Sequence, residues 1–159
     1  SGRYNSSSGD YSIVTGGGFN TASNSYSIVV GGGGNTSSGN SSIVIGGGNN
    51  TASGDYSFVG GGNDNQSNAN SSVICGGKEN ANSGQYSFIG AGYQNSVSSI
   101  YGAVVTGRRN TASGFRSFIG SGYYNSASGS YAFIGSGYQN QATGYSSIIV
   151  GGGGYNTTS

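Results

Sequence analysis

Pairs of apolar residues recur at one fixed interval along the chain. Ile13-Val14 is followed by Ile28-Val29 and Ile43-Val44, and the series continues in steps of 15 residues to Ile148-Ile149. Columns of Asn and Gly keep the same interval, so the consensus is S-[IF]-[VI]-x-G-G-x-x-N-T-A-S-G-x-Y. A constant repeat length indicates a solenoid, because each coil must lie in register on the preceding one.

A unit of 15 residues is too short for two helices and a turn. Ile, Val, Phe, Tyr, Ser and Thr separated by Gly and Asn are typical of short strands joined by turns. The sequence therefore predicts an all-β fold without helices: a parallel β-solenoid of about ten 15-residue coils, with two short strands in each. Residues 1–159 form a single array, which we interpret as a segment of a longer chain or filament because it begins and ends in mid-repeat. The last repeat departs from the pattern, since Asn156 comes one place late.

Alternation along a strand assigns the side chains of each coil to two faces. In the segment 56–60, Ser57 and Val59 share one face, and the position of Val59 is Val or Ile in every coil. Such uniformity indicates the interior of a narrow coil, to which the T-A-S segment adds alanines such as Ala52 and Ala112. The predicted interior column is Val14, Val29, Val44, Val59, Ile74, Ile89, Val104, Ile119, Ile134 and Ile149.

The opposite face of the same segment follows a size rule. Phe58 is followed two residues later by Gly60, whereas a smaller first residue is followed by a larger one, as in Ala103 and Val105. Packed side chains conserve combined volume because voids and overfilling both cost stability. We therefore expect this face to be buried against another chain, and we interpret Cys75, which occupies the same column, as a small buried apolar residue. The predicted inter-chain face comprises Tyr26, Ile28, Tyr56, Phe58, Tyr86, Phe88, Phe118, Tyr131 and Phe133.

The Gly and Asn columns are expected to be structural. The Gly column is expected to supply a positive φ or a close backbone approach at a turn. The Asn column is expected to form a ladder in which each amide bonds turn backbone and its neighbours. This ladder comprises Asn20, Asn35, Asn50, Asn65, Asn80, Asn95, Asn110, Asn125 and Asn140.

Residues that carry chemistry are scarce. The chain has no His and one Cys, which excludes a multi-ligand Cys/His metal site, a disulfide within one chain and a His-based acid or base. Asp10 and Asp55 share a column but lie three coils, about 14 Å, apart, too far for a catalytic pair of carboxylates. We therefore expect no enzyme, no cofactor and no metal site.

The charge balance and the apolar runs exclude two further classes of partner. A net charge of +1 gives no basic footprint for nucleic acid. The apolar runs are far shorter than the roughly 20 residues of a membrane helix, so we expect no membrane insertion by this segment. We interpret Lys78-Glu79, Arg108-Arg109 and Arg116 as solvated turn residues, the alternative being a small polar patch.

Two segments of the chain carry a resemblance to a known family. Residues 51–62, T-A-S-G-D-Y-S-F-V-G-G-G, and residues 127–137, A-S-G-S-Y-A-F-I-G-S-G, resemble the head repeats of YadA-like trimeric autotransporter adhesins. Similar repeats occur in phage and viral fibre proteins. The resemblance implies a left-handed parallel β-roll, three chains side by side, and a location outside the cell, where such heads adhere to host matrix or to other cells.

These observations favour a structural or adhesive extracellular fibre module at the cell surface or on a virion or phage fibre. We expect it to self-associate as a homotrimer or as an end-to-end filament, with a host matrix or cell-surface ligand as a possible further partner. The alternative is an ice-binding solenoid with hydroxyls in outward rows, namely Thr21/Ser23, Thr36/Ser38, Thr51/Ser53 and Thr111/Ser113. The rows are broken at Gln66/Asn68, Ala81, Ser96 and Gln141.

Overall fold

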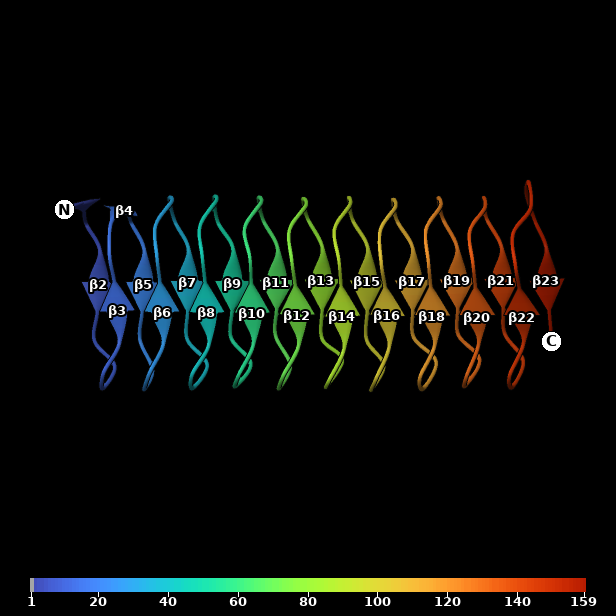
Figure 1. The fold of residues 1–159 in the computed structure, drawn as a ribbon, viewed down its shortest axis with the longest axis horizontal. Coiled ribbons are helices and arrows are strands. Elements are labelled where there is room, and N and C mark those ends of the chain that lie inside the picture. Colours follow the sequence, from blue (N-terminus) through green and yellow to red (C-terminus); the bar gives the residue numbers. More distant parts are fainter. Residues whose placement is uncertain (1) are drawn as a thin grey trace.

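Each repeat forms one coil of a straight rod, and successive coils lie side by side along its axis (Figure 1). The structure is a computed structural model that describes residues 2–159. Every strand in it is two residues long, all pairing is parallel, and the register shifts by 15 residues per coil, as in the pairing of Phe58 with Val73, except for a shift of 16 where Gln141 pairs with Thr157. Residues 2–159 contain no helix. The predicted all-β parallel solenoid is confirmed.

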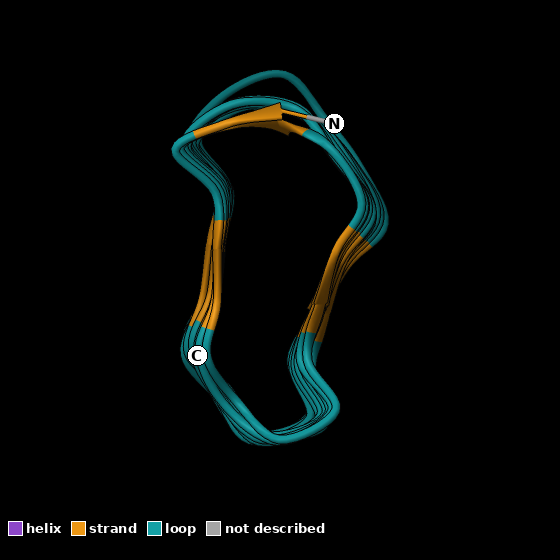
Figure 2. Ribbon diagram, turned by 90° about the vertical axis from the view of Figure 1, so that its left-hand side faces the viewer, coloured by secondary structure: helices purple, strands orange, loops and turns teal. Residues whose placement is uncertain are grey.

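Two long sheets run the length of the rod and face each other across the coil, as the view along the axis shows (Figure 2). The ten-stranded sheet contains β3 (Ile13–Val14), β6 (Ile28–Val29), β8 (Ile43–Val44), β10 (Phe58–Val59), β12 (Val73–Ile74), β14 (Phe88–Ile89), β16 (Ala103–Val104), β18 (Phe118–Ile119), β20 (Phe133–Ile134) and β22 (Ile148–Ile149). The eleven-stranded sheet contains β2 (Ser6–Ser7), β5 (Thr21–Ala22), β7 (Thr36–Ser37), β9 (Thr51–Ala52), β11 (Gln66–Ser67), β13 (Ala81–Asn82), β15 (Ser96–Val97), β17 (Thr111–Ala112), β19 (Ser126–Ala127), β21 (Gln141–Ala142) and β23 (Thr157–Thr158).

A third line of pairing closes one edge of the coil. It begins with β1 (Gly2–Arg3) and β4 (Gly17–Gly18) and continues as single parallel bridges from Gly18 to Tyr138. The opposite edge is a turn that carries the tyrosine column. The two edges lie at opposite ends of the coil and are separated by the two sheets (Figure 2).

The interior of the rod is a single file of apolar side chains from the two sheets. Because a strand alternates its side chains, the second residue of each strand points inward. Ala52 and Ala112 of the eleven-stranded sheet are fully buried and face this file. The structure places the predicted interior column here: Val29, Val44, Val59, Ile74, Ile89, Val104, Ile119 and Ile134 are fully buried, Ile149 nearly so, and Val14 of the first coil partly.

A polar seam within the same interior went unpredicted. Where the eleven-stranded sheet contributes Ser37, its hydroxyl donates to the carbonyl of Ser42 at 2.8 Å and lies 2.6 Å from the Ser42 hydroxyl. Where it contributes Val97 instead, the facing residue is Gly102, and a Cβ on Gly102 would lie 2.9 Å from Val97 Cγ1. The pair of bonded hydroxyls recurs at Ser67 and Ser72, whereas in coils such as that of Ala52 and Ser57 an alanine faces the serine.

The asparagine column forms a continuous ladder beside the Gly edge. Asn80 Oδ1 accepts the backbone N–H of Asn95 at 2.9 Å, while Asn80 Nδ2 donates to the carbonyls of Gly76 and Gly92 at 3.2 and 3.0 Å. The same amide donates to Asn65 Oδ1 at 3.0 Å. Every predicted ladder residue, from Asn20 to Asn140, is buried, with at most 1% of its surface exposed. Asn156 continues the ladder despite its late position, because it donates to Asn140 Oδ1 at 2.9 Å.

Two turn positions in each coil have a left-handed backbone although most of their residues are not Gly. Tyr56 has a φ of 57°, and its N–H donates back to Asn40 of the preceding coil at 2.8 Å. The left-handed conformation costs about 1–2 kcal/mol per residue, which these inter-coil bonds help to offset. The prediction that Tyr56 lies in a strand with Phe58 is therefore wrong, because β10 begins at Phe58. The same correction applies to Tyr26, Tyr86 and Tyr131, with φ values of 58°, 56° and 61°.

The Gly column has a positive φ in every coil from Gly17 to Gly152, as predicted. At Gly77, φ is 92°, and a Cβ would lie 2.3 Å from Gly92 O and 2.7 Å from Asn80 Nδ2. At the neighbouring Gly76, by contrast, a Cβ would meet no atom within 4 Å. The two adjacent glycines therefore differ in both conformation and available space.

Replacing Gly77 by Ala is expected to lower the free energy of unfolding by more than about 2 kcal/mol, because the left-handed penalty adds to the steric clash. Gly76→Ala is expected to change it by less than about 0.5 kcal/mol. Urea unfolding followed by far-UV circular dichroism measures both values. Equal losses from the two substitutions would contradict this account of the Gly column.

Candidate interaction surfaces

The rod offers surfaces and no cavity. No pocket is found in the structure, and residues 2–159 contain no group of three or more His, Cys, Asp or Glu side chains placed to hold a metal ion. Among the same residues there is no helix with the length and hydropathy needed to cross a membrane. Candidate functional sites must therefore be sought on the outer faces of the two sheets and on the two edges of the coil.

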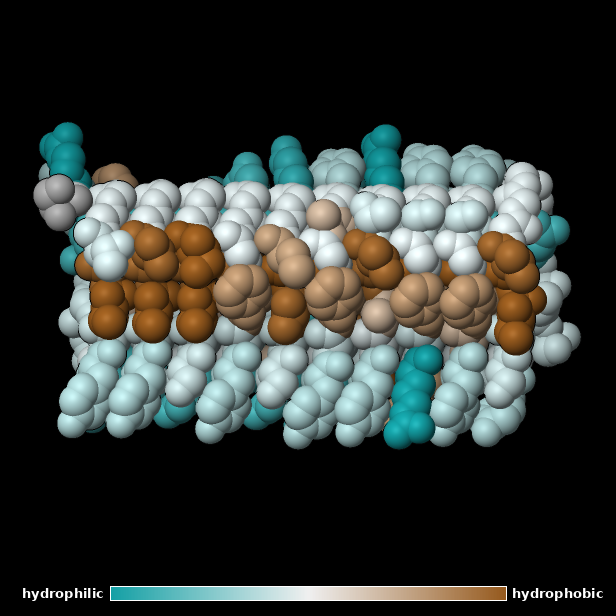
Figure 3. Space-filling view, in the orientation of Figure 1, coloured by the Kyte–Doolittle hydropathy of each residue, from teal (hydrophilic) through white to brown (hydrophobic). Residues whose placement is uncertain are grey.

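We define the apolar face as the outward side chains of the ten-stranded sheet together with the residue that follows each strand. Apolar side chains form a band along the rod in Figure 3, bordered by a row of larger, less apolar side chains. Val30, Ile45 and Val105 on this face are 42%, 43% and 41% exposed in the single chain. Cys75 is also exposed, so the interpretation of it as buried is wrong for the chain by itself.

The size rule on the apolar face has a cause within the single chain. The ring of Phe58 lies over Gly60, where an added Cβ would be 3.2 Å from ring atom Cε1, and Phe88 lies in the same way over Gly90 at 3.4 Å. An added Cβ at Gly60 would lie closer still, 2.4 Å, to the carbonyl oxygen of Cys75 in the next coil, so the ring and the neighbouring backbone together leave no room for a side chain there. The paired sizes do not by themselves require burial by another chain, which corrects the basis of that expectation.

The predicted inter-chain residues fall into two groups on this side of the rod. Ile28, Phe58, Phe88, Phe118 and Phe133 are the outward residues of their strands, and the rings of Phe118 and Phe133 stack with centroids 5.2 Å apart. The tyrosines Tyr26, Tyr56, Tyr86 and Tyr131 lie on the adjoining turn, and all are exposed.

The outer side of the eleven-stranded sheet is a polar face. Thr21, Thr36 and Thr51 pair in register on adjacent strands, and the row then passes to Gln66 and Ala81. Because Ser6 pairs with Thr21 in the same way, the hydroxyl row is continuous over four coils, is interrupted by a longer and then a shorter side chain, and resumes over Ser96, Thr111 and Ser126. Ice binding stays a prediction, and measurement of thermal hysteresis at high protein concentration tests it.

One edge of the rod carries a ladder of cations and aromatic rings that the sequence interpretation missed. We call it the cation–aromatic edge. The Arg108 guanidinium carbon lies 5.3 Å from the ring centroids of both Tyr93 and Tyr123. Lys78 lies 5.9 Å from the Tyr93 ring, and Tyr123 stacks on Tyr138 at 5.5 Å. These five residues occupy successive coils of one column, so the 15-residue period contained the signal.

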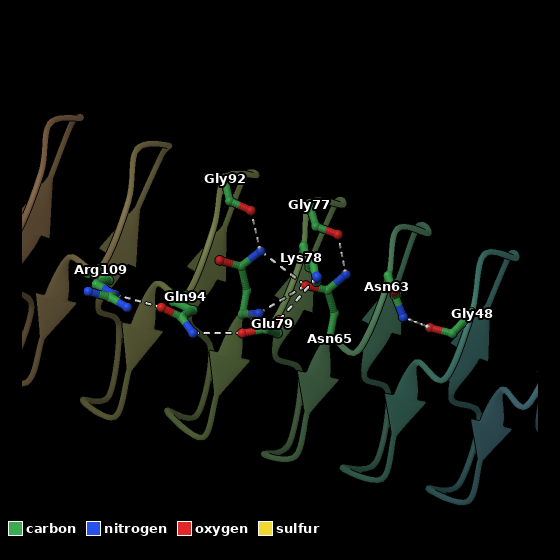
Figure 4. Close-up of polar contacts among 10 residues, drawn as sticks. Gly48, Asn63, Asn65, Gly77, Lys78, Glu79, Gly92, Gln94 and Arg109 are labelled. Carbon is green, nitrogen blue, oxygen red and sulfur yellow. Dashed lines mark hydrogen bonds and ion pairs between the residues drawn. The ribbon is translucent and has the colours of Figure 1, made fainter.

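A second column runs beside the first on the same edge (Figure 4). Gln94 Nε2 donates to Glu79 Oε2 at 2.6 Å, and Arg109 Nε donates to Gln94 Oε1 at 2.6 Å. Arg109 Nη1 also donates to the Tyr124 hydroxyl. The hydrogen bond from Gln94 lowers the pKa of Glu79, and the bond to Tyr124 raises the pKa of Arg109. Both residues therefore keep their charge at neutral pH.

The five cations do not form one patch. Arg116 belongs to the opposite edge, where its guanidinium carbon lies 5.0 Å from the Phe115 ring and 5.3 Å from the Tyr101 ring. Lys78 and Glu79 form an ion pair at 3.3 Å, the sole one among residues 2–159. Arg108 and Arg109 are therefore not neutralised by a carboxylate.

Neither a family model nor a curated protein matches the chain. The surfaces described above are thus the basis for any statement about function.

Proposed function

We propose that the chain is a structural, adhesive module of an extracellular fibre in which copies pack side by side through the apolar face. The observation that carries the proposal is the partial exposure of this face along the whole rod: Phe88 and Phe133 are 37% exposed and Ile45 43%, while Ile13 and Ile148 in the two end strands reach 48% and 63%. Large contiguous apolar surfaces on soluble proteins mark interaction sites. The opposite sheet carries hydroxyl and amide side chains, so one side of the rod is specialised for contact.

A second copy of the same chain is the partner that fits this face. Its ridges repeat at the coil spacing of about 4.8 Å, and a surface with the same spacing can meet them along the entire rod. Another copy has that spacing by construction. A net charge of +1 gives only weak repulsion between copies. The shared coil spacing and the low net charge favour lateral association, as in a homotrimer, over contact at the rod ends.

The extracellular and adhesive parts of the proposal are supported by the resemblance of residues 51–62 and 127–137 to adhesin head repeats. Lateral packing through the apolar face would leave the polar face and the cation–aromatic edge available to a host matrix or cell-surface ligand. A cell surface or a virion or phage fibre is the expected location. The proposal does not require any chemistry from the chain.

Replacing Phe88 by Asp is expected to dissociate the assembly, because a carboxylate would be buried between copies without a partner. We expect the association constant to fall at least about 100-fold, while the circular dichroism spectrum is unchanged. Thr111→Asp adds the same charge on the exposed polar face and serves as the control. Sedimentation velocity measures the particle size for both variants, and an unchanged particle for Phe88→Asp would refute the interface.

A further inference from the structure

We propose that the cation–aromatic edge binds an acidic polysaccharide, with Arg108 and Arg109 contacting its carboxylate or sulfate groups. The inference deepens the adhesive role proposed above and rests on it. It uses no residue of the apolar face, so the two proposals can fail separately.

Arg108 is held in place before any ligand arrives. Tyr93 and Tyr123 flank its guanidinium on both sides at 5.3 Å, whereas its side chain remains exposed to solvent. No hydrogen bond or ion pair of the Arg108 side chain is present within residues 2–159. The two rings restrain the Arg108 guanidinium, and its N–H donors remain free to bond a ligand. Such a group is suited to bind a planar or tetrahedral anion through two parallel hydrogen bonds.

Arg109 adds a second positioned cation without losing its charge to a carboxylate. Its two observed partners, Gln94 and Tyr124, are neutral, and the neighbouring Glu79 is paired with Lys78 at 3.3 Å. Asp64 occupies the same column three coils away, or about 14 Å. Consecutive residues of one coil therefore place two positive charges on this edge of a nearly neutral rod.

The spacing of the edge favours a sugar chain over an acidic peptide. Side chains of this edge recur once per coil, about every 4.8 Å, and this is comparable to the length of one sugar unit in an extended polysaccharide. An extended peptide rises about 3.3 Å per residue and turns alternate side chains away. Its acidic side chains would therefore not match the spacing of about 4.8 Å between successive coils of this edge. Tyr123, Tyr124 and Tyr138 add rings and hydroxyl groups beside the two arginines, which suits a ligand with both apolar C–H faces and hydroxyls.

The same edge provides its own comparison in the first half of the rod. There the ladder positions are Gly18, Gly33 and Gly48, which offer backbone and no side chain. The site is thus confined to the coils from Lys78 to Tyr138. Arg3 occupies the same column at the far end, seven coils or about 34 Å from Arg108, and its guanidinium carbon lies 5.6 Å from the Tyr4 ring.

The test is isothermal titration calorimetry of the intact chain with four probes: oligogalacturonate, dextran sulfate, neutral dextran and poly-L-glutamate. We expect at least one of the two acidic glycans to bind, which identifies the anion as carboxylate or sulfate, and both neutral dextran and poly-L-glutamate to bind much more weakly. Absence of binding by both acidic glycans, or equal binding of poly-L-glutamate, would overturn the proposal.

Variants locate the site. Arg108→Ala is expected to weaken glycan binding at least about tenfold, and Arg108→Lys to weaken it less, because lysine retains the charge but not the paired donors. Arg3→Ala removes the same charge from the same column and is expected to leave the affinity within about twofold. An equal loss for Arg3→Ala would show non-specific attraction to the rod and refute the site. Sedimentation of Arg108→Ala should match the wild type, so that loss of binding is distinguished from loss of assembly.

Discussion

Replacing Val104 by Asp is expected to destabilise the coil severely, whereas the same replacement at the next residue, Val105, is expected to leave the fold intact. Val104 is fully buried in the interior file, while Val105 is 41% exposed on the apolar face. A carboxylate in the interior would have to be neutralised or left without a partner, which costs several kcal/mol. Because whole domains are stable by only about 5–15 kcal/mol, we expect a loss of at least about 4 kcal/mol.

The pair compares the inward residue of β16 with the outward residue that follows it, using the same chemical change. For Val105→Asp we expect a loss below about 1 kcal/mol in the isolated chain, together with weaker self-association. Equilibrium unfolding in urea, monitored by far-UV circular dichroism, gives both free energies. Similar losses at the two positions would mean that the interior and the apolar face have been assigned incorrectly.

The asparagine ladder carries the second large effect. Asn80→Ala removes the acceptor of the Asn95 N–H and the donor to the carbonyls of Gly76 and Gly92. Each buried polar group left without a partner costs about 1–3 kcal/mol, and water can reach only part of this site. We therefore expect a total loss of about 3 kcal/mol.

Asn68→Ala is the control for the ladder, because Asn68 is exposed on the polar face and is expected to change stability by less than about 0.5 kcal/mol. Guanidinium chloride unfolding compares the two variants. Hydrogen exchange should show the added opening of Asn80→Ala in the coils next to it, since a solenoid is coupled mainly through neighbouring repeats. An unaffected stability for Asn80→Ala would mean that the ladder is not a structural element.

Periodicity made the interior and the ladder predictable from the sequence. In the interior and the ladder, every coil places the same residue type at the same position, so Val59 and Asn80 each represent a whole column. Because each of these residues stacks on its equivalents in the neighbouring coils, all members of a column have the same structural role. The length of the strands was less accessible. Tyr56 precedes Phe58 by two residues and looks like a strand residue, because Tyr favours strands and rarely has a positive φ. The left-handed backbone of Tyr56 is held by a hydrogen bond to Asn40 of the preceding coil, and the intrinsic conformational preference of tyrosine does not predict such a bond.

The surfaces were harder to predict than the interior for a physical reason. The compensation between Phe58 and Gly60 pointed to packing, but a ring lying over its own coil explains it as well as a second chain does. The cation–aromatic edge went unrecognised because Arg108 and Tyr93 are different residue types whose relation appears only when they stack. An interior column can be recognised because the same residue type repeats in every coil. A surface column such as the cation–aromatic edge alternates complementary residue types, so repetition of one type does not reveal it.

The central claim is that copies of this rod pack side by side through the apolar face, and solution X-ray scattering of the wild-type chain tests it most directly. One experiment yields the particle mass, the cross-section and the greatest length. We predict a mass that is a multiple of 15.7 kDa, a widened cross-section and a length that stays near that of one rod, about 50 Å. A particle of 15.7 kDa, or one that lengthens at constant cross-section, would contradict the claim.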